Sequence, residues 1–172
     1  MFFNYTLLLV LFVVSIPFHA VADETQKYVS PDGKLHALVV PVGKAGDGPR
    51  ESRVEVRNSG GKVLLSRSFA SKDGEHGYVV YRADWTADSQ FFVFSVGSSG
   101  GHQPWHSPIY FYCRSDSRLR LLDDYLGPIT DPNFMLSAPD TIHATKLKKY
   151  GDLESVAVEA KLSKLIKQNL KR

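Results

Sequence analysis

The sequence is poor in cysteine, whose disulfide bonds stabilise many small exported proteins. Its 172 residues contain one cysteine, Cys113, so no intramolecular disulfide bond can form. Tyr110, Phe111 and Tyr112 precede Cys113, and these neighbours predict a buried thiol in a strand, without a nucleophilic role. The chain is long enough to bury a stable hydrophobic core without disulfide bonds.

Charge is absent from the N-terminus. Residues 1–22 contain no Lys, Arg, Asp or Glu, and Leu7–Val14 is continuously apolar. This run is shorter than the about 20 residues that span a bilayer, and Ala20–Ala22 ends it with small residues. The pattern predicts a signal peptide cleaved after Ala22, hence a periplasmic or secreted protein with one domain over 23–172. An uncleaved anchor is the alternative, because Met1–Asn4 has no basic residue.

The positive charge is confined to the C-terminal part of the chain. Residues 23–145 hold 13 basic and 15 acidic side chains, whereas residues 146–172 hold 8 and 3. A slightly acidic body in an exported chain argues against nucleic acid as a partner. The basic tail from about residue 146 could contact a membrane surface. Because apolar residues interrupt it, a solvated face is the favoured interpretation.

Segments with helical periodicity are scarce, and turn signals recur every 8 to 14 residues. Arg53–Arg57 alternates valine with charge, which indicates a strand with one solvated face. Phe91–Val96 is apolar on both faces, which marks a central strand. The fold class predicted is all-β: an antiparallel meander in the form of a sandwich, an open barrel or a propeller-like fragment. Further strands are expected at Leu35–Val42, Lys62–Phe69, Gly77–Arg82, Ile109–Cys113, Leu119–Leu122 and Thr141–Leu147.

The segment that follows Gly151-Asp152, a predicted two-residue turn, is ambiguous. Residues 153–165 fit the period of a strand and that of a helix. We expect a strand to Leu162 and then a short C-terminal helix over Ser163–Leu170, capped by Ser163.

Three short segments each place an aspartate turn before an apolar strand: Ser30–Leu35, Trp85–Phe91 and Ser137–Ile142. Their aspartates are 56 and 52 residues apart. These turns resemble the Ser-Pro-Asp-Gly-Lys turn of WD-type β-propeller repeats in exported bacterial proteins. We interpret the similarity as shared turn chemistry, with a propeller fragment as the alternative that the resemblance implies. A closed propeller needs at least four blades, for which the 150 residues of 23–172 are few.

The motif Gly97-Ser98-Ser99-Gly100-Gly101 has the form of a hydrolase nucleophile elbow. Asp123 and His143 follow it in the chain order of a catalytic triad. However, an elbow requires a helix directly after the serine, and Gly100, Gly101 and Pro104 oppose one. No catalytic residue is therefore predicted.

His102 and His106 are candidate metal ligands, with His76, Asp84 or Glu75 as further donors. Imidazole pairs bind zinc or copper, but a structural site needs four ligands in a defined geometry. Two loop histidines separated by Gln-Pro-Trp have no fixed register. No phosphate loop or nucleotide fingerprint is present, so no cofactor is predicted.

The Gly97–His106 loop is the best candidate for recognition, since it displays aromatic and polar side chains between two apolar strands. The side chains expected to converge near one end of the sheet are those of Trp85, His102, Gln103, Trp105, His106 and Tyr110. Such a surface suits a protein, peptide or carbohydrate partner. In the alternative interpretation Trp105 folds back as a plug over the end of the barrel or sandwich.

The order of elements from Ala83 to Leu122 also resembles small periplasmic lysozyme inhibitors, in which a loop enters the active-site cleft of the enzyme. We therefore expect an exported, non-catalytic binding protein that presents the Gly97–His106 loop. The alternative is a metal-binding protein or small hydrolase that uses His102 and His106.

Overall fold

The computed structural model describes residues 24–43, 49–100, 105–149 and 154–169. Within these ranges the chain forms three antiparallel β-sheets and two short helices, which confirms the all-β fold expected from the sequence. No helix in the described ranges is long and apolar enough to cross a membrane. The predicted signal peptide, the turn at Gly151-Asp152, His102 and Gln103 lie outside the described residues.

Sheet A is a four-stranded meander. Val54 and Val56 are fully buried, whereas Arg53 and Arg57 point to the other face and are partly exposed. The predicted inner face of valines is confirmed, but Glu55 on the other face is buried between Arg53 and Arg57, with which it pairs, so that face is only partly solvated. The sheet order is β1 (Gln26–Val29), β2 (Leu35–Val42), β3 (Glu51–Asn58) and β4 (Val63–Ser68).

Sheet B is a second four-stranded meander with the most apolar strand in the molecule. Residues 91–97 are all buried, so β6 is the central strand that its sequence predicts. Cys113 is a buried free thiol with its Sγ 3.2 Å from Ser115 Oγ, as expected for a structural cysteine. The sheet order is β5 (Tyr78–Trp85), β6 (Phe91–Ser98), β7 (Ile109–Cys113) and β8 (Arg118–Leu121).

Sheet C has three strands, and Leu162 and Leu165 of the helix that follows its last strand pack into the core that it shares with sheet B. The sheet order is β11 (Ser155–Lys161), β10 (Thr141–Leu147) and β9 (Met135–Ser137). Helix α1 (Asp123–Leu126) follows sheet B, and α2 (Leu162–Asn169) follows β11.

The predicted strand-to-helix transition is confirmed, but the expected cap is wrong. The Leu162 amide donates to the backbone oxygen of Asp140 at 3.1 Å, and the Ser163 amide donates to its Oδ2 at 2.9 Å. Helix α2 therefore begins at Leu162, and the buried Asp140 binds its first amides in place of a Ser163 cap.

The basic C-terminal segment is part of sheet C. Lys146 lies in β10, and its Nζ donates to the backbone oxygen of Leu126 at 2.6 Å. Lys148 pairs with Glu154 across the β10–β11 connection at 2.8 Å. Lys146 and Lys161 lie in strands, Lys164 and Lys167 lie in α2, and Lys148 and Lys149 follow β10, so the described basic residues do not form a detached tail.

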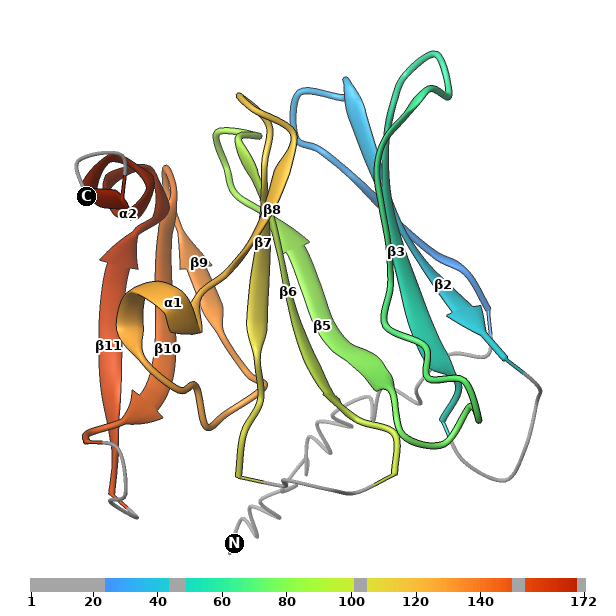
Figure 1. Cartoon of the computed structure of the whole chain (residues 1–172). Helices are drawn as coiled ribbons and strands as arrows, with labels where there is room; N and C mark the ends of the chain where they lie inside the picture. The colour runs from blue at the N-terminus through green and yellow to red at the C-terminus, as the bar shows by residue number, and fades with distance from the viewer. Residues whose placement is uncertain (1–23, 44–48, 101–104, 150–153, 170–172) are drawn as a thin grey trace, which may run out of the picture.

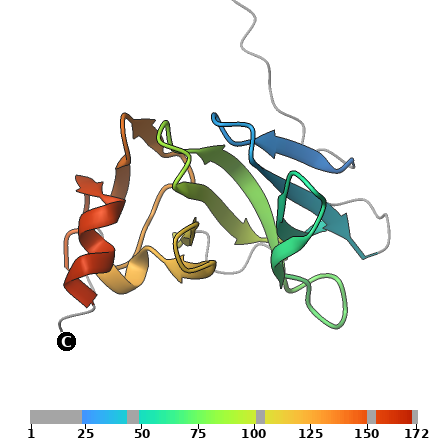
Figure 2. The ribbon, with the colours of Figure 1, turned by 90° about the horizontal axis from the view of Figure 1, so that it is seen from above.

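The three sheets lie side by side, with sheet B between sheets A and C (Figure 1). Seen from above, they run from the blue strands of sheet A to the red helix α2 beside sheet C (Figure 2). Phe92, Phe94 and Tyr112 fill the core between sheets A and B. Phe91 and Phe111 fill the core between sheets B and C. Because sheet B contributes to both cores, its strands carry apolar residues on both faces.

The aspartate turns of sheets A and B share one hydrogen-bond pattern. Ser30 Oγ donates to Asp32 Oδ1 at 2.7 Å and accepts from the Leu35 amide at 3.0 Å. Thr86 Oγ1 donates to Asp88 Oδ1 at 2.6 Å and accepts from the Phe91 amide at 3.0 Å. The repetition noticed in the sequence is therefore a repetition of turn geometry; the relationship to propellers stays a prediction.

The three turns also bind one another at the upper end of Figure 1. The Asp32 amide donates to Ser89 Oγ at 3.0 Å, and the Asp88 amide donates to the Pro139 oxygen at 3.3 Å. Arg114, from the β7–β8 turn, donates to Asp32 Oδ2 at 2.6 Å. The Gly97–His106 loop joins β6 to β7 at the opposite end of sheet B.

Candidate functional site: a loop tied at both ends

The Gly97–His106 loop leaves sheet B where β6 ends, at Ser98, and returns at Ile109, where β7 begins. The structure describes the first part of the loop to Gly100 and the last part from Trp105. Each of these parts is tied to the body of the protein by a carboxylate. The two carboxylates belong to Glu51 and Asp123.

Glu51 ties down the first part of the loop. Ser99 Oγ donates to Glu51 Oε1 at 2.9 Å, and the Ser99 amide donates to the Gly77 oxygen at 2.9 Å. The same carboxylate accepts from the amide and the hydroxyl of Ser71, at 2.7 and 2.8 Å, and from the Gly77 amide at 2.5 Å. Glu51 thus joins the β4–β5 connection to the Gly97–His106 loop through four hydrogen bonds.

Glu51 is 1% exposed, although it directly follows the polar, glycine-rich residues 44–50 in the sequence. Burial by itself raises the pKa of this carboxyl, but the hydrogen bonds from Ser71, Ser99 and Gly77 outweigh it, so the pKa is lowered. Glu51 is therefore held as an anion that organises two loops.

Gly77 lies where no side chain fits. A Cβ there would overlap both the Phe69 backbone oxygen and the Glu51 carboxylate. The glycine is required because the backbone must approach Glu51 closely enough for its amide to donate.

Asp123 ties down the last part of the loop. His106 Nε2 lies 2.8 Å from Asp123 Oδ2, and that oxygen also accepts from the Ile129 amide at 3.1 Å. The Ser107 amide donates to the Ile129 oxygen at 2.9 Å. The His106 ring is therefore held between α1 and the chain segment that follows it.

Trp105 stacks on this fixed imidazole. The two ring centroids are 5.2 Å apart with an angle of 25° between the planes, and Trp105 remains 50% exposed. The ring thus faces solvent rather than folding into the sheet as a plug.

Two other residues proposed from the sequence lie elsewhere. Trp85 ends β5 next to the aspartate turn of sheet B; it is 5% exposed, packs on Phe92 and donates from Nε1 to the Tyr28 oxygen at 3.1 Å. The expectation that Trp85 converges with the loop is therefore wrong. Tyr110 is half-buried and stacks on Phe94 in the core between sheets A and B, and burial raises its pKa.

The residues of the hydrolase interpretation are not brought together. Ser99 binds Glu51, Asp123 binds His106, and His143 Nε2 binds Ser137 at 2.9 Å on sheet C. The Ser99 hydroxyl donates to the Glu51 carboxylate, whereas the triad order in the sequence would require it to donate to His143. Within the described ranges no three His, Cys, Asp or Glu side chains form a metal-binding group.

Tyr81 is an exposed aromatic residue that the sequence analysis missed. The register of β5 against β6 shifts between Val80 and Arg82, so Tyr81 is the extra residue of a β-bulge. A Cβ at Gly97 would overlap the Tyr81 ring, and therefore the ring covers this glycine. A bulge places an additional side chain where strict alternation would not, which is why Tyr81 could not be assigned to a face from the sequence.

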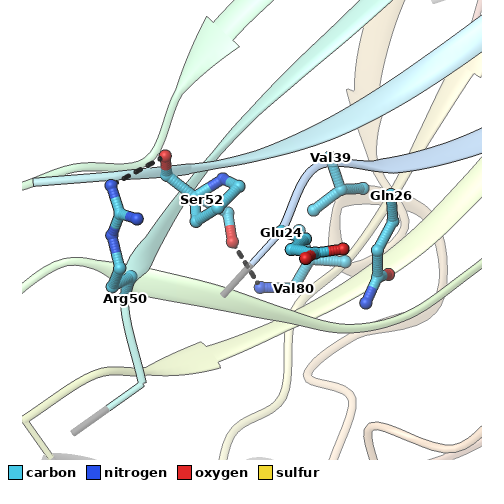
Figure 3. Close-up of a pocket in the computed structure, with 7 residues that line it drawn as sticks. Glu24, Gln26, Val39, Arg50, Ser52 and Val80 are labelled. Carbon is cyan, nitrogen blue, oxygen red and sulfur yellow. Dashed lines mark hydrogen bonds between the residues drawn. The ribbon is translucent and has the colours of Figure 1, made fainter. Parts of the chain in front are cut away.

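A small pocket at the edge of sheet A does not offer a binding site for an organic ligand (Figure 3). Its volume admits about one water molecule. Beside it, Ser52 Oγ accepts from the Val80 amide at 3.0 Å and Arg50 donates to the Pro41 oxygen at 3.3 Å. The residues lining it are Glu24, Gln26, Val39, Pro41, Arg50, Ser52 and Val80.

Within the described residues, the exposed surface of this loop includes half of the Trp105 ring. Glu51, Ser99 and Asp123 hold the ends of the loop in place. Only Ser99 and Asp123 could be singled out from the sequence, because they fit the motif and chain order of a hydrolase triad. Comparison of the chain with protein-family models, with curated proteins and with solved structures finds no match.

Proposed function

We propose that the chain is a small exported binding protein without catalytic activity, which presents the Gly97–His106 loop to a partner in the periplasm or outside the cell. The observation that carries this proposal is the half-exposed Trp105 ring, stacked on an imidazole that Asp123 holds in place. An aromatic side chain fixed before binding loses little conformational entropy when it is covered.

The ties at both ends of the loop support the same proposal. Ser99 is bound to Glu51 in β3 and His106 to Asp123 in α1, so the described parts of the loop have fixed attachments to sheet A and to α1. A loop of glycines and serines without these hydrogen bonds would lose more conformational entropy when a partner orders it. Export is supported by the uncharged, apolar N-terminal sequence with its small residues at Ala20–Ala22.

The test is capture by the immobilised mature chain, residues 23–172, from a periplasmic or secreted fraction. Three forms are compared: wild type, Trp105→Ala, and Met135→Ala, which removes an apolar side chain that is 66% exposed on sheet C. We expect one component, identified by mass spectrometry, to be retained by wild type and Met135→Ala and lost with Trp105→Ala. Equal retention by all three forms would reject the loop as the binding surface.

A further inference from the structure

Tyr81 and Trp105 lie at the same end and on the same side of sheet B. In β6 the residues Phe91 and Val93 face sheet C, and Gly97 follows them in alternation. Tyr81 covers Gly97, so its ring is also on this side. Trp105 joins it there, since the adjoining His106 binds Asp123, which directly follows Leu122 of the same core.

Each of the two rings has one face covered and is half exposed. Tyr81 is 50% exposed with one face on Gly97, and Trp105 is 50% exposed with one face on His106. The opposite face of each ring is therefore the part that meets solvent. The glycine and the imidazole act as supports that keep the rings from turning edge-on.

Tyr81 belongs to β5, whereas Trp105 precedes Ile109, the first residue of β7, by four residues. The two rings therefore come from chain segments on either side of β6. A ligand with several flat units can offer one unit to each ring.

Resting on the proposed function, we infer that the partner is a neutral oligosaccharide chain, whose sugar rings stack on the exposed faces of Tyr81 and Trp105. The C–H bonds on one face of a pyranose carry slight positive charge and match the negative face of an aromatic ring. A protein partner would instead favour a contiguous apolar centre depleted of charge. Asp123 and the exposed Asp124 adjoin the Trp105 side, and their carboxylates disfavour an acidic glycan.

Gly97 offers a test that removes no aromatic ring. Its φ is not in the left-handed region, so alanine is compatible with the backbone, but the added Cβ overlaps the Tyr81 ring and must displace it. Gly97→Ala and Tyr81→Ala should therefore weaken binding alike. Tyr78→Ala is the matched control, because Tyr78 is a 36% exposed tyrosine of the same strand that shares the opposite face with Val80.

The experiment is a titration of the mature protein with four neutral hexasaccharides: chitohexaose, cellohexaose, maltohexaose and mannohexaose. Binding is followed by calorimetry and by tryptophan fluorescence. We expect saturable binding of at least one of them, weakened about tenfold or more by Tyr81→Ala and by Trp105→Ala. Tyr78→Ala should leave the dissociation constant within about twofold. Thermal unfolding of each variant, measured in parallel, identifies losses caused by misfolding.

Absence of saturable binding for all four sugars, or equal weakening by Tyr78→Ala, overturns the inference. If wild type binds no hexasaccharide but captures a protein or peptide through Trp105, the carbohydrate inference fails and the proposed function stands. If Trp105→Ala changes neither sugar binding nor capture, both fail.

Discussion

His106 and Asp123 are 17 residues apart in the chain, yet their side chains meet at 2.8 Å between Nε2 and Oδ2. The contact attaches the end of the Gly97–His106 loop to α1. It also gives Trp105 a rigid neighbour on which to stack. The orientation of the exposed indole therefore depends on a carboxylate with which it shares no element.

Replacing Asp123 with alanine should loosen this arrangement. The change leaves the Ile129 amide and His106 without their acceptor, which costs about 1–3 kcal/mol of unfolding free energy. Urea unfolding measures the cost, and stronger acrylamide quenching of Trp105 reports the released ring. Asp124→Ala, an exposed neighbour in the same turn, is the control and should stay within about 0.5 kcal/mol. Identical behaviour of the two variants would contradict the role given to Asp123.

Glu51 should make the stability of the protein depend on pH. Its pKa in the folded state lies below the ordinary value of 4.5, so the folded state is favoured while the carboxyl is ionised above that pH. This contribution is lost as the pH falls through the folded pKa. Glu51→Gln should lower the unfolding free energy at neutral pH by about 2–4 kcal/mol and flatten its decline as the pH falls below about 4.5.

Urea unfolding of wild type, Glu51→Gln and Glu75→Gln over this pH range provides the measurement. Glu75 is an exposed carboxylate in the neighbouring loop, so its replacement should preserve the wild-type profile. A Glu51→Gln profile that parallels the wild type would show that the four hydrogen bonds do not select the ionised form.

The two tryptophans should differ sharply in their importance for folding. Trp85 packs on Phe92 and Tyr112 in the core, and Trp85→Ala should cost about 3–5 kcal/mol. Trp105→Ala should cost less than about 1 kcal/mol, because half of the ring is already in water. Chemical denaturation of both variants checks the assignment, which fails if the order is reversed.

The aspartate turns of sheets A and B should contribute equally to stability. Ser30→Ala and Thr86→Ala each remove a hydroxyl that donates to an aspartate and accepts from a strand amide. Each should cost about 1–3 kcal/mol, and Thr86→Ser, which keeps the hydroxyl, should recover most of it. Thermal unfolding provides the comparison. A large loss of stability at one turn and none at the other would show that the two turns have the same hydrogen bonds but contribute differently to the unfolding free energy.

The strands were predictable where alternation or apolarity was strong. Val54 and Val56 identified the inner face of β3, and Phe91–Val96 identified the central strand. The short elements were harder to predict. Strands β1 and β9 have four and three residues, which are too few to show a period, and α1 has a single turn. Tertiary contacts, rather than local sequence, define these elements.

The sequence indicated where the candidate site lies, but not which residues hold it in place. Trp105 and His106 were identified by residue type and by their glycine-rich surroundings. Trp85 was misplaced, although successive turns of a meander lie at alternate ends of the sheet, which puts the turn after Trp85 opposite the Gly97–His106 loop. Glu51 could not be found, because its burial depends on Ser71, Gly77 and Ser99, which are 20 to 48 residues away in the chain.

The bonds between the aspartate turns fasten the three sheets at the end remote from Trp105. The opposite rim carries the Gly97–His106 loop, whose described ends Glu51 and Asp123 hold in place. Loop residues other than those that make these bonds can be exchanged while the fastened rim maintains the scaffold, in the way that antibody frameworks tolerate new binding loops. The fold is thus a candidate framework for engineered recognition.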